Sequence, residues 1–205
     1  AAIARMAATR LKASELLKLS YATPVFRRHP SEGIQEFFQI GVECIGESSI
    51  QSDCALLRLC LQSLKQMGFS DVILLLNHKD ALSGLSSNEL KALKQKNYVD
   101  LGYIPKQVSL EDVANENKLP GSAYFSELLD TFDAPKAIRI DTALIKDLDY
   151  YTGFFFNVII PGYEHVVASG GRYDQLLAAF GCKKPAVGFA IYLNRLQESL
   201  KGGRK

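Results

Sequence analysis

The amino-acid sequence predicts an α+β domain: a mostly antiparallel sheet with helices packed on one face. Residues 36–46 alternate apolar and polar side chains, which is typical of a strand that is half-buried in an antiparallel sheet. Apolar strands recur along the chain, and hairpins between them alternate with long connections, as in α+β proteins. The 205 residues could form one large domain or two small ones, and we interpret residues 1–205 as one domain.

Composition and charge exclude several classes of protein. The formal net charge of +2 is too small for a protein that wraps nucleic acid. No apolar run approaches the roughly 20 residues that span a bilayer, and the N-terminus has no signal-peptide pattern. The four cysteines have no C-x-x-C spacing, which indicates buried thiols in a reducing, cytoplasmic compartment. We therefore expect no metal site, no cofactor and no membrane or nucleic-acid partner.

The first quarter of the chain predicts a helix and a hairpin. Residues 1–19 have apolar side chains at helical spacing and no capping residue before them, so we expect sequence missing upstream. A strand is expected over 18–27, with Pro24 indicating a sheet edge or a bulge, and a hairpin loop over 28–35 leads into the strand at 36–46.

A helix and a buried strand are expected next. Asp53 is predicted to cap a helix over 54–67, which ends at Gly68 and leads into a strand at 71–78. Residues 80–133 have the composition of short helices and connections, an insertion-like region without a chemical motif. The later predictions are strands at 136–144, 153–161 and 185–191, a glycine turn into a helix over 168–181, and a helix from Leu193.

The polar face of the strand at 36–46 is the first candidate site. Phe38, Ile40, Val42 and Cys44 would face the core, which leaves Gln39 and Glu43 on the opposite face with Gly41 between them. Burying an amide and a carboxylate costs several kcal/mol unless both find partners, and a ligand with an ammonium or imidazole group would supply them. The alternative is that both side chains face solvent.

Three further stretches carry groups that could bind a ligand. Arg27, beside Arg28, could hold a carboxylate or phosphate, although a solvated surface pair is the more common explanation for such a dipeptide. The glycines in 168-ASGGRYDQLL-177 could free backbone N–H groups for an anion, which by itself is a weak indication. Tyr150 and Tyr151 could offer hydroxyls over an apolar wall, or could be core aromatics without a ligand.

Five segments in order resemble the catalytic domain of class II histidyl-tRNA synthetases: VFRRHP, EFFQIGVECIG, KDLDYYTGFFF, SGGRYDQLL and PAVGFAIYLNRL. The resemblance is weakest between about residues 80 and 133. It implies a class II synthetase-like core with a histidine pocket, in which Gln39 and Glu43 would meet the amino group and the ring. The other residues that it implies for this pocket are Arg27, Lys146, Tyr150, Tyr151, Ala168, Gly171 and Tyr173. By the same resemblance, Phe37 and Arg195 would belong to a vestigial ATP site.

Departures from the synthetase pattern argue against adenylation. Lys146 stands where the synthetases have an arginine, and lysine does not reproduce a bidentate contact with carboxylate and phosphate. His29 stands near the place of the acid that follows the motif 2 arginine, and that loop's own arginine is missing. Tyr192 and Asn194 would fill the ATP site at motif 3 and remove charge from it. We therefore expect no catalytic residues.

This combination resembles the regulatory subunits of ATP phosphoribosyltransferase, catalytically silent paralogues of the synthetases. The resemblance implies a homodimer within a hetero-oligomer with the short-form catalytic subunit, activation of the first step of histidine biosynthesis, and feedback by histidine. The chain ends shortly after motif 3, so no anticodon-binding domain is expected. Two alternatives stay open: an active histidine–tRNA ligase core with Lys146 in place of arginine, and a synthetase-like enzyme that acts on another small acceptor.

Overall fold

The computed structural model describes residues 2–11, 16–29, 33–101, 104–116, 121–133, 135–146 and 150–202. The helices and strands within these ranges are, in chain order, α1 Ala2–Thr9, β1 Leu17–His29, β2 Gly33–Ile45, α2 Ile50–Gln66, β3 Ile73–His78, α3 Lys79–Leu82, α4 Ser87–Lys94, α5 Tyr98–Leu101, β4 Gln107–Ser109, α6 Leu110–Glu116, α7 Ser122–Thr131, η1 Pro135–Ala137, β5 Ile138–Asp141, β6 Phe154–Ile159, β7 Ala168–Arg172, η2 Leu177–Phe180, β8 Ala186–Tyr192 and α8 Leu193–Gly202.

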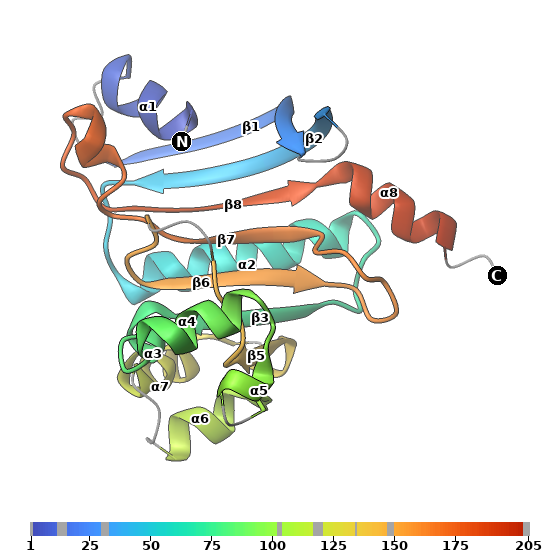
Figure 1. Ribbon diagram of the computed structural model, residues 1–205. Helices are drawn as coiled ribbons and strands as arrows, with labels where there is room; N and C mark the ends of the chain where they lie inside the picture. Colours follow the sequence, from blue (N-terminus) through green and yellow to red (C-terminus); the bar gives the residue numbers. More distant parts are fainter. Residues whose placement is uncertain are drawn as a thin grey trace.

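One eight-stranded sheet organises the domain, with the strand order β1-β2-β8-β7-β6-β3-β5-β4 (Figure 1). Every neighbouring pair is antiparallel except β3 and β5, which are parallel. The β1–β2 hairpin pairs in register from Leu17 with Ile45 to His29 with Gly33, and β1 forms a sheet edge. The predicted α+β class, the hairpin and the edge position of Pro24 are thereby confirmed.

The main core lies between the sheet and the helices α2, α6 and α7. Phe154 and Phe156 of β6 pack there against Leu57 of α2 and Phe125 of α7, and all four side chains are fully buried. Removing this apolar surface from water contributes the largest favourable term to folding. Among the described helices, none is long and apolar enough to cross a membrane.

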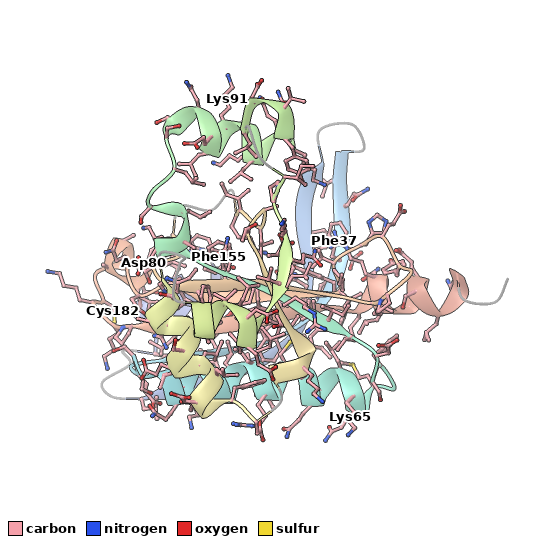
Figure 2. The ribbon with its side chains drawn as sticks, turned by 90° about the horizontal axis from the view of Figure 1, so that it is seen from below. Phe37, Lys65, Asp80, Lys91, Phe155 and Cys182 are labelled. Carbon is pink, nitrogen blue, oxygen red and sulfur yellow. The ribbon has the colours of Figure 1, made fainter. Side chains whose placement is uncertain are left out.

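The opposite face of the sheet is only partly covered. Helix α1 packs near one end, around Ile45 and Tyr173, and α3 and α4 lie near β3 and β6. Lys65 of α2 and Lys91 of α4 lie on opposite sides of the sheet (Figure 2). The expectation that the helices pack on one face is therefore wrong for α1, α3 and α4, and holds for α2, α6, α7 and α8. The gap in this second layer leaves room for cavities.

Two predicted helix boundaries were wrong. The first helix ends at Thr9 rather than at residue 19, because the chain from Leu17 onward pairs with β2. Ser49 caps α2 in place of Asp53, since its hydroxyl accepts a hydrogen bond from the Ser52 N–H at 3.2 Å. Asp53 lies within the first turn of α2, where its carboxylate serves a buried ion pair with Arg172.

The glycine turn predicted for 168–181 was also wrong. Gly170 and Gly171 lie inside β7, between β6 and β8, and only a short 3-10 helix follows. A side chain at Gly170 would come within 2.8 Å of the Phe156 ring and the Phe189 Cβ. The glycines therefore permit close packing within the sheet, and they do not present N–H groups at a helix start.

Candidate functional site

A cavity of about 840 Å³ opens on the partly covered face of the sheet. Strands β1, β2, β7 and β8 line it, with α1 and the residues around Lys146 and Tyr150. This volume falls within the range of small-molecule sites in proteins, roughly 300–1,000 Å³. The polar and aromatic side chains that line it include Tyr21, Gln39, Glu43, Lys146, Tyr150, Tyr151, Ser169, Tyr173 and Tyr192.

Two glycines allow larger side chains to lie flat on the cavity floor. Tyr21 of β1 lies across its cross-strand partner Gly41, and Glu43 of β2 lies across its partner Gly188 in β8. A Cβ atom at either glycine would overlap the side chain that covers it. The space that the sequence leaves at Gly41 is therefore taken by Tyr21.

Gln39 presents an unsatisfied donor in this region. The residue is 4% exposed, and its buried side-chain Nε2 has no hydrogen-bond partner among the residues that the structure describes. Leaving a buried amide donor unpaired costs about 1–3 kcal/mol, so such a group usually has a partner. Because Gln39 lines the cavity, a ligand acceptor there would satisfy Nε2. The structure places the polar face of β2 in a cavity wall rather than on an open surface.

Glu43 accepts a hydrogen bond from the hydroxyl of Tyr173. Burial raises the pKa of the Glu43 carboxyl to about 7, and the Tyr173 hydrogen bond offsets part of that rise. Burial, together with the neighbouring Glu43, also raises the pKa of Tyr173. The Glu43 carboxyl can therefore bind or release a proton near neutral pH, and a cationic ligand would favour its ionised form.

Three tyrosine rings form the aromatic wall of the cavity. The centroids of Tyr150 and Tyr151 are 4.7 Å apart, and Tyr150 meets Tyr173 edge-on at 6.0 Å. The Tyr151 ring packs over Gly171, where an added Cβ would lie 2.7 Å from Tyr151 Cε1. The two adjacent tyrosines thus line a cavity and also pack on one another, which combines the two interpretations that the sequence left open.

Lys146 brings a half-buried cation to the edge of the cavity. Its Nζ donates a hydrogen bond to the Asn157 side-chain oxygen of β6. Burial lowers the pKa of Lys146 to about 8. Among the described residues, no carboxylate forms a salt bridge with this ammonium. A carboxylate on a ligand would therefore stabilise its charged form.

Some predicted site residues do not line this cavity. Ala168 packs into the main core on the opposite face, because strand alternation turns its neighbour Ser169 toward the cavity instead. Gly171 lies beneath Tyr151. Phe37 is half-buried on β2 outside the lining residues, and the Arg27 side chain is outside the described part of the chain.

Arg195 is also turned away from the cavity. It donates a hydrogen bond to the Val166 backbone oxygen at 2.7 Å, and its guanidinium lies 4.9 Å from the centre of the Tyr192 ring. The Tyr192 hydroxyl is 2.6 Å from the Ser169 Oγ, so this tyrosine is fixed at the cavity wall. Asn194 accepts a hydrogen bond from the Phe38 N–H at 2.7 Å.

Sequence reasoning did not include Tyr21, Ser169 or Gly188 in the site. The alternation along β8 could have placed Gly188 beside Tyr192 on one face, because both have even numbers in one strand. Whether Tyr21 and Ser169 line the cavity depends on which strands become neighbours, and local patterns do not reveal that order. Among the described residues, no cluster of three histidine, cysteine or acidic side chains could hold a metal ion.

Comparison with known proteins identifies the family. The profile of the histidyl-tRNA synthetase family matches residues 1–126 and 111–196. The chain belongs to this family. It is 31% identical to the ATP phosphoribosyltransferase regulatory subunit of Bacillus pumilus, with 97% of this chain and 61% of that protein covered. Identity to the corresponding subunit of Carboxydothermus hydrogenoformans is also 31%, over 97% of this chain and 73% of that protein.

A solved structure of the same family has the same fold. It is an ATP phosphoribosyltransferase regulatory subunit/histidyl-tRNA synthetase from Bacillus halodurans, with a TM-score of 0.81 and 25% identity over 97% of this chain and 62% of that one. The predicted synthetase-like core is thereby confirmed. The chain spans about three-fifths of the length of several curated relatives, including the Bacillus pumilus subunit.

Proposed function

We propose that this member of the histidyl-tRNA synthetase family is a non-catalytic regulatory subunit that binds free histidine in the large cavity. In this proposal it assembles as a homodimer with the short-form ATP phosphoribosyltransferase catalytic subunit, activates the first step of histidine biosynthesis, and takes part in feedback by histidine. The names of the relatives support the regulatory assignment. The observation that carries the proposed ligand is the buried Nε2 of Gln39, which has no partner among the described residues and lines the same cavity as Glu43.

The chemistry of the cavity complements a zwitterionic amino acid with a polar ring. The carboxylate of Glu43 would attract the ammonium or a protonated imidazole, and Gln39 would donate to an acceptor of the ligand. The ligand's ring would lie against Tyr151 and Tyr173. Lys146 would attract the ligand's carboxylate as a point charge, with no bidentate geometry.

Three features argue against adenylation in this cavity. Activating a carboxylate with ATP requires cations positioned on the developing phosphate charge. Arg195 contacts a backbone oxygen and the Tyr192 ring in place of the cavity, Tyr192 occupies the wall, and a lysine stands at position 146. Neither Arg195 nor the residue at position 146 would therefore supply the arginine contact that adenylation needs.

The family profile favours one alternative, an active histidine–tRNA ligase core. In that case, Lys146 would replace arginine at the reacting carboxylate. This alternative requires turnover that the regulatory proposal excludes.

Histidine-dependent exchange between ATP and pyrophosphate separates the two functions. We expect none from this protein, and turnover on the order of 1 s⁻¹, within the usual enzyme range, would overturn the regulatory proposal. Mixing the protein with a short-form ATP phosphoribosyltransferase should raise that enzyme's activity and produce co-elution on gel filtration. Separate elution at micromolar concentration with an unchanged rate would refute the proposed partnership.

A further inference from the structure

A second cavity of about 460 Å³ lies on the same face of the sheet, between β6 and the helices α3 and α4. The side chains of Leu82, Leu85, Leu90 and Phe155 give it an apolar lining. No function assigned above uses this cavity. Its volume is sufficient for a small organic ligand.

Positive charge predominates among the residues that line this cavity. Lys79, Lys94 and Lys146 contribute three ammonium groups, and Asp80 is the one acidic residue among the described residues of the lining. The Asp80 carboxylate lies 3.5 Å from Nδ1 of His78, whose pKa is lowered by burial. His78 is therefore mostly neutral at neutral pH, and within the described part of the lining the lysine side chains outnumber the single carboxylate.

The two cavities share a wall. Ile145, Lys146 and Tyr151 line both of them, so the Lys146 side chain lies between the two cavities. This cation is half-buried, and it donates a hydrogen bond to the neutral side chain of Asn157. Two anions, one in each cavity, would compete for the same charge and would repel one another.

We propose that the second cavity binds a small amphipathic anion, an acid with an apolar body and one phosphate or carboxylate group. The apolar body would pack against Phe155 and the leucines, and the anionic group would meet the ammonium groups of Lys79, Lys94 and Lys146. Because Lys146 is shared, occupation of this cavity weakens the binding of an amino acid in the large cavity. By linkage, the bound amino acid weakens the binding of the anion by the same factor.

Calorimetric titration with phenyl phosphate tests the site directly. Benzyl alcohol tests the ring without charge, inorganic phosphate tests the charge without a ring, and benzoate separates carboxylates from phosphate esters. The informative variants are Lys79→Met and Lys94→Met. Lys91→Met is the matched control, because Lys91 lies on α4 with Lys94 but does not line the cavity.

We expect phenyl phosphate or benzoate to bind more tightly than either benzyl alcohol or inorganic phosphate. Each lining variant should weaken that binding by about threefold to tenfold, while Lys91→Met leaves it unchanged. Three results would each overturn the proposal. They are equal affinity of phenyl phosphate for the wild type and the three variants, binding of benzyl alcohol as tight as that of the acids, and no binding of either acid at about 10 mM. Thermal midpoints near that of the wild type establish that the variants are folded.

The coupling has its own measurement. Phenyl phosphate at saturation should raise the Kd for histidine, and histidine should raise the Kd for phenyl phosphate by an equal factor. Failure of histidine to bind at all would refute the proposed function and leave the direct titration as the test of the second site. If both ligands bind independently, the shared role of Lys146 is wrong.

Discussion

The Tyr173 hydroxyl donates a hydrogen bond to the carboxylate of Glu43, although the two residues are 130 positions apart in the sequence. Glu43 lies on β2, and Tyr173 follows β7 on the other side of β8. The carboxyl group is thereby held on the cavity floor above Gly188, with its pKa near 7. This arrangement places a group that can change its charge at neutral pH in the proposed histidine site.

Replacing Glu43 by Ala should weaken histidine binding more than replacing Lys146 by Ala. Removing a hydrogen bond to a charged group costs about 1.5–3 kcal/mol, or roughly tenfold to a hundredfold in Kd. Lys146 acts as a flexible point charge, so its loss should cost less. Calorimetric titration of histidine into the wild type and both variants measures the difference. Unchanged affinity in Glu43→Ala would mean that histidine binds elsewhere.

The stability of the protein should depend on pH through Glu43. Its folded-state pKa of about 7 lies above the ordinary 4.5, so the folded protein favours the protonated carboxyl and loses stability as pH rises through 7. The Glu43→Gln variant keeps a hydrogen-bond acceptor for the Tyr173 hydroxyl but cannot ionise, so it should not lose stability in this pH range. Its thermal midpoint should therefore match the wild type near pH 4.5 and exceed it at pH 8.

Glu36→Gln is the matched control for this pH experiment, since Glu36 is an exposed carboxylate on the same strand. A constant difference between Glu43→Gln and the wild type at all pH values would contradict the raised pKa of Glu43.

Gly188→Ala should displace the Glu43 carboxylate, because the new Cβ would overlap it. We expect a loss of about 1–3 kcal/mol in the free energy of unfolding, as for other overpacked sites, together with weaker histidine binding. Gly84→Ala adds the same methyl group where no atom lies within 4 Å, and should change neither. Equal effects of the two substitutions in denaturant titrations would show that Glu43 moves aside without cost.

The Arg172 guanidinium and the Asp53 carboxylate form a buried ion pair between β7 and α2. Arg172 Nε donates to the Asp53 Oδ1 at 3.0 Å, and the two side chains are 9% and 5% exposed. Asp53→Asn should cost about 1.5–3 kcal/mol of unfolding free energy, because it removes the buried carboxylate and leaves the arginine charge with Asp174, which is 33% exposed, as its remaining ionic partner among the described residues.

The exposed pair of Arg58 and Asp133 provides the comparison for this substitution. Asp133 is 70% exposed on its side chain, so Asp133→Asn should cost no more than about 1 kcal/mol. Urea titrations of both variants measure the two costs. Similar losses would mean that burial does not determine the importance of the Arg172–Asp53 pair.

Local patterns in the sequence identified the faces of the strands. The period of two along β2 predicted that Gln39 and Glu43 share a face, and both line the cavity. The class of fold and the edge position of Pro24 followed from the same kind of pattern. These features depend on residues close together in the chain, so one sequence is enough to predict them.

Tertiary structure alone decided which residues from distant strands meet. Strand β8 lies between β2 and β7, which brings Gly188 under Glu43 and Tyr173 within hydrogen-bonding distance of it. The same pairing turns Ala168 into the core and Ser169 toward the cavity. Strand order and register are set by the burial of whole faces of the sheet, a global free energy that no local window of sequence contains.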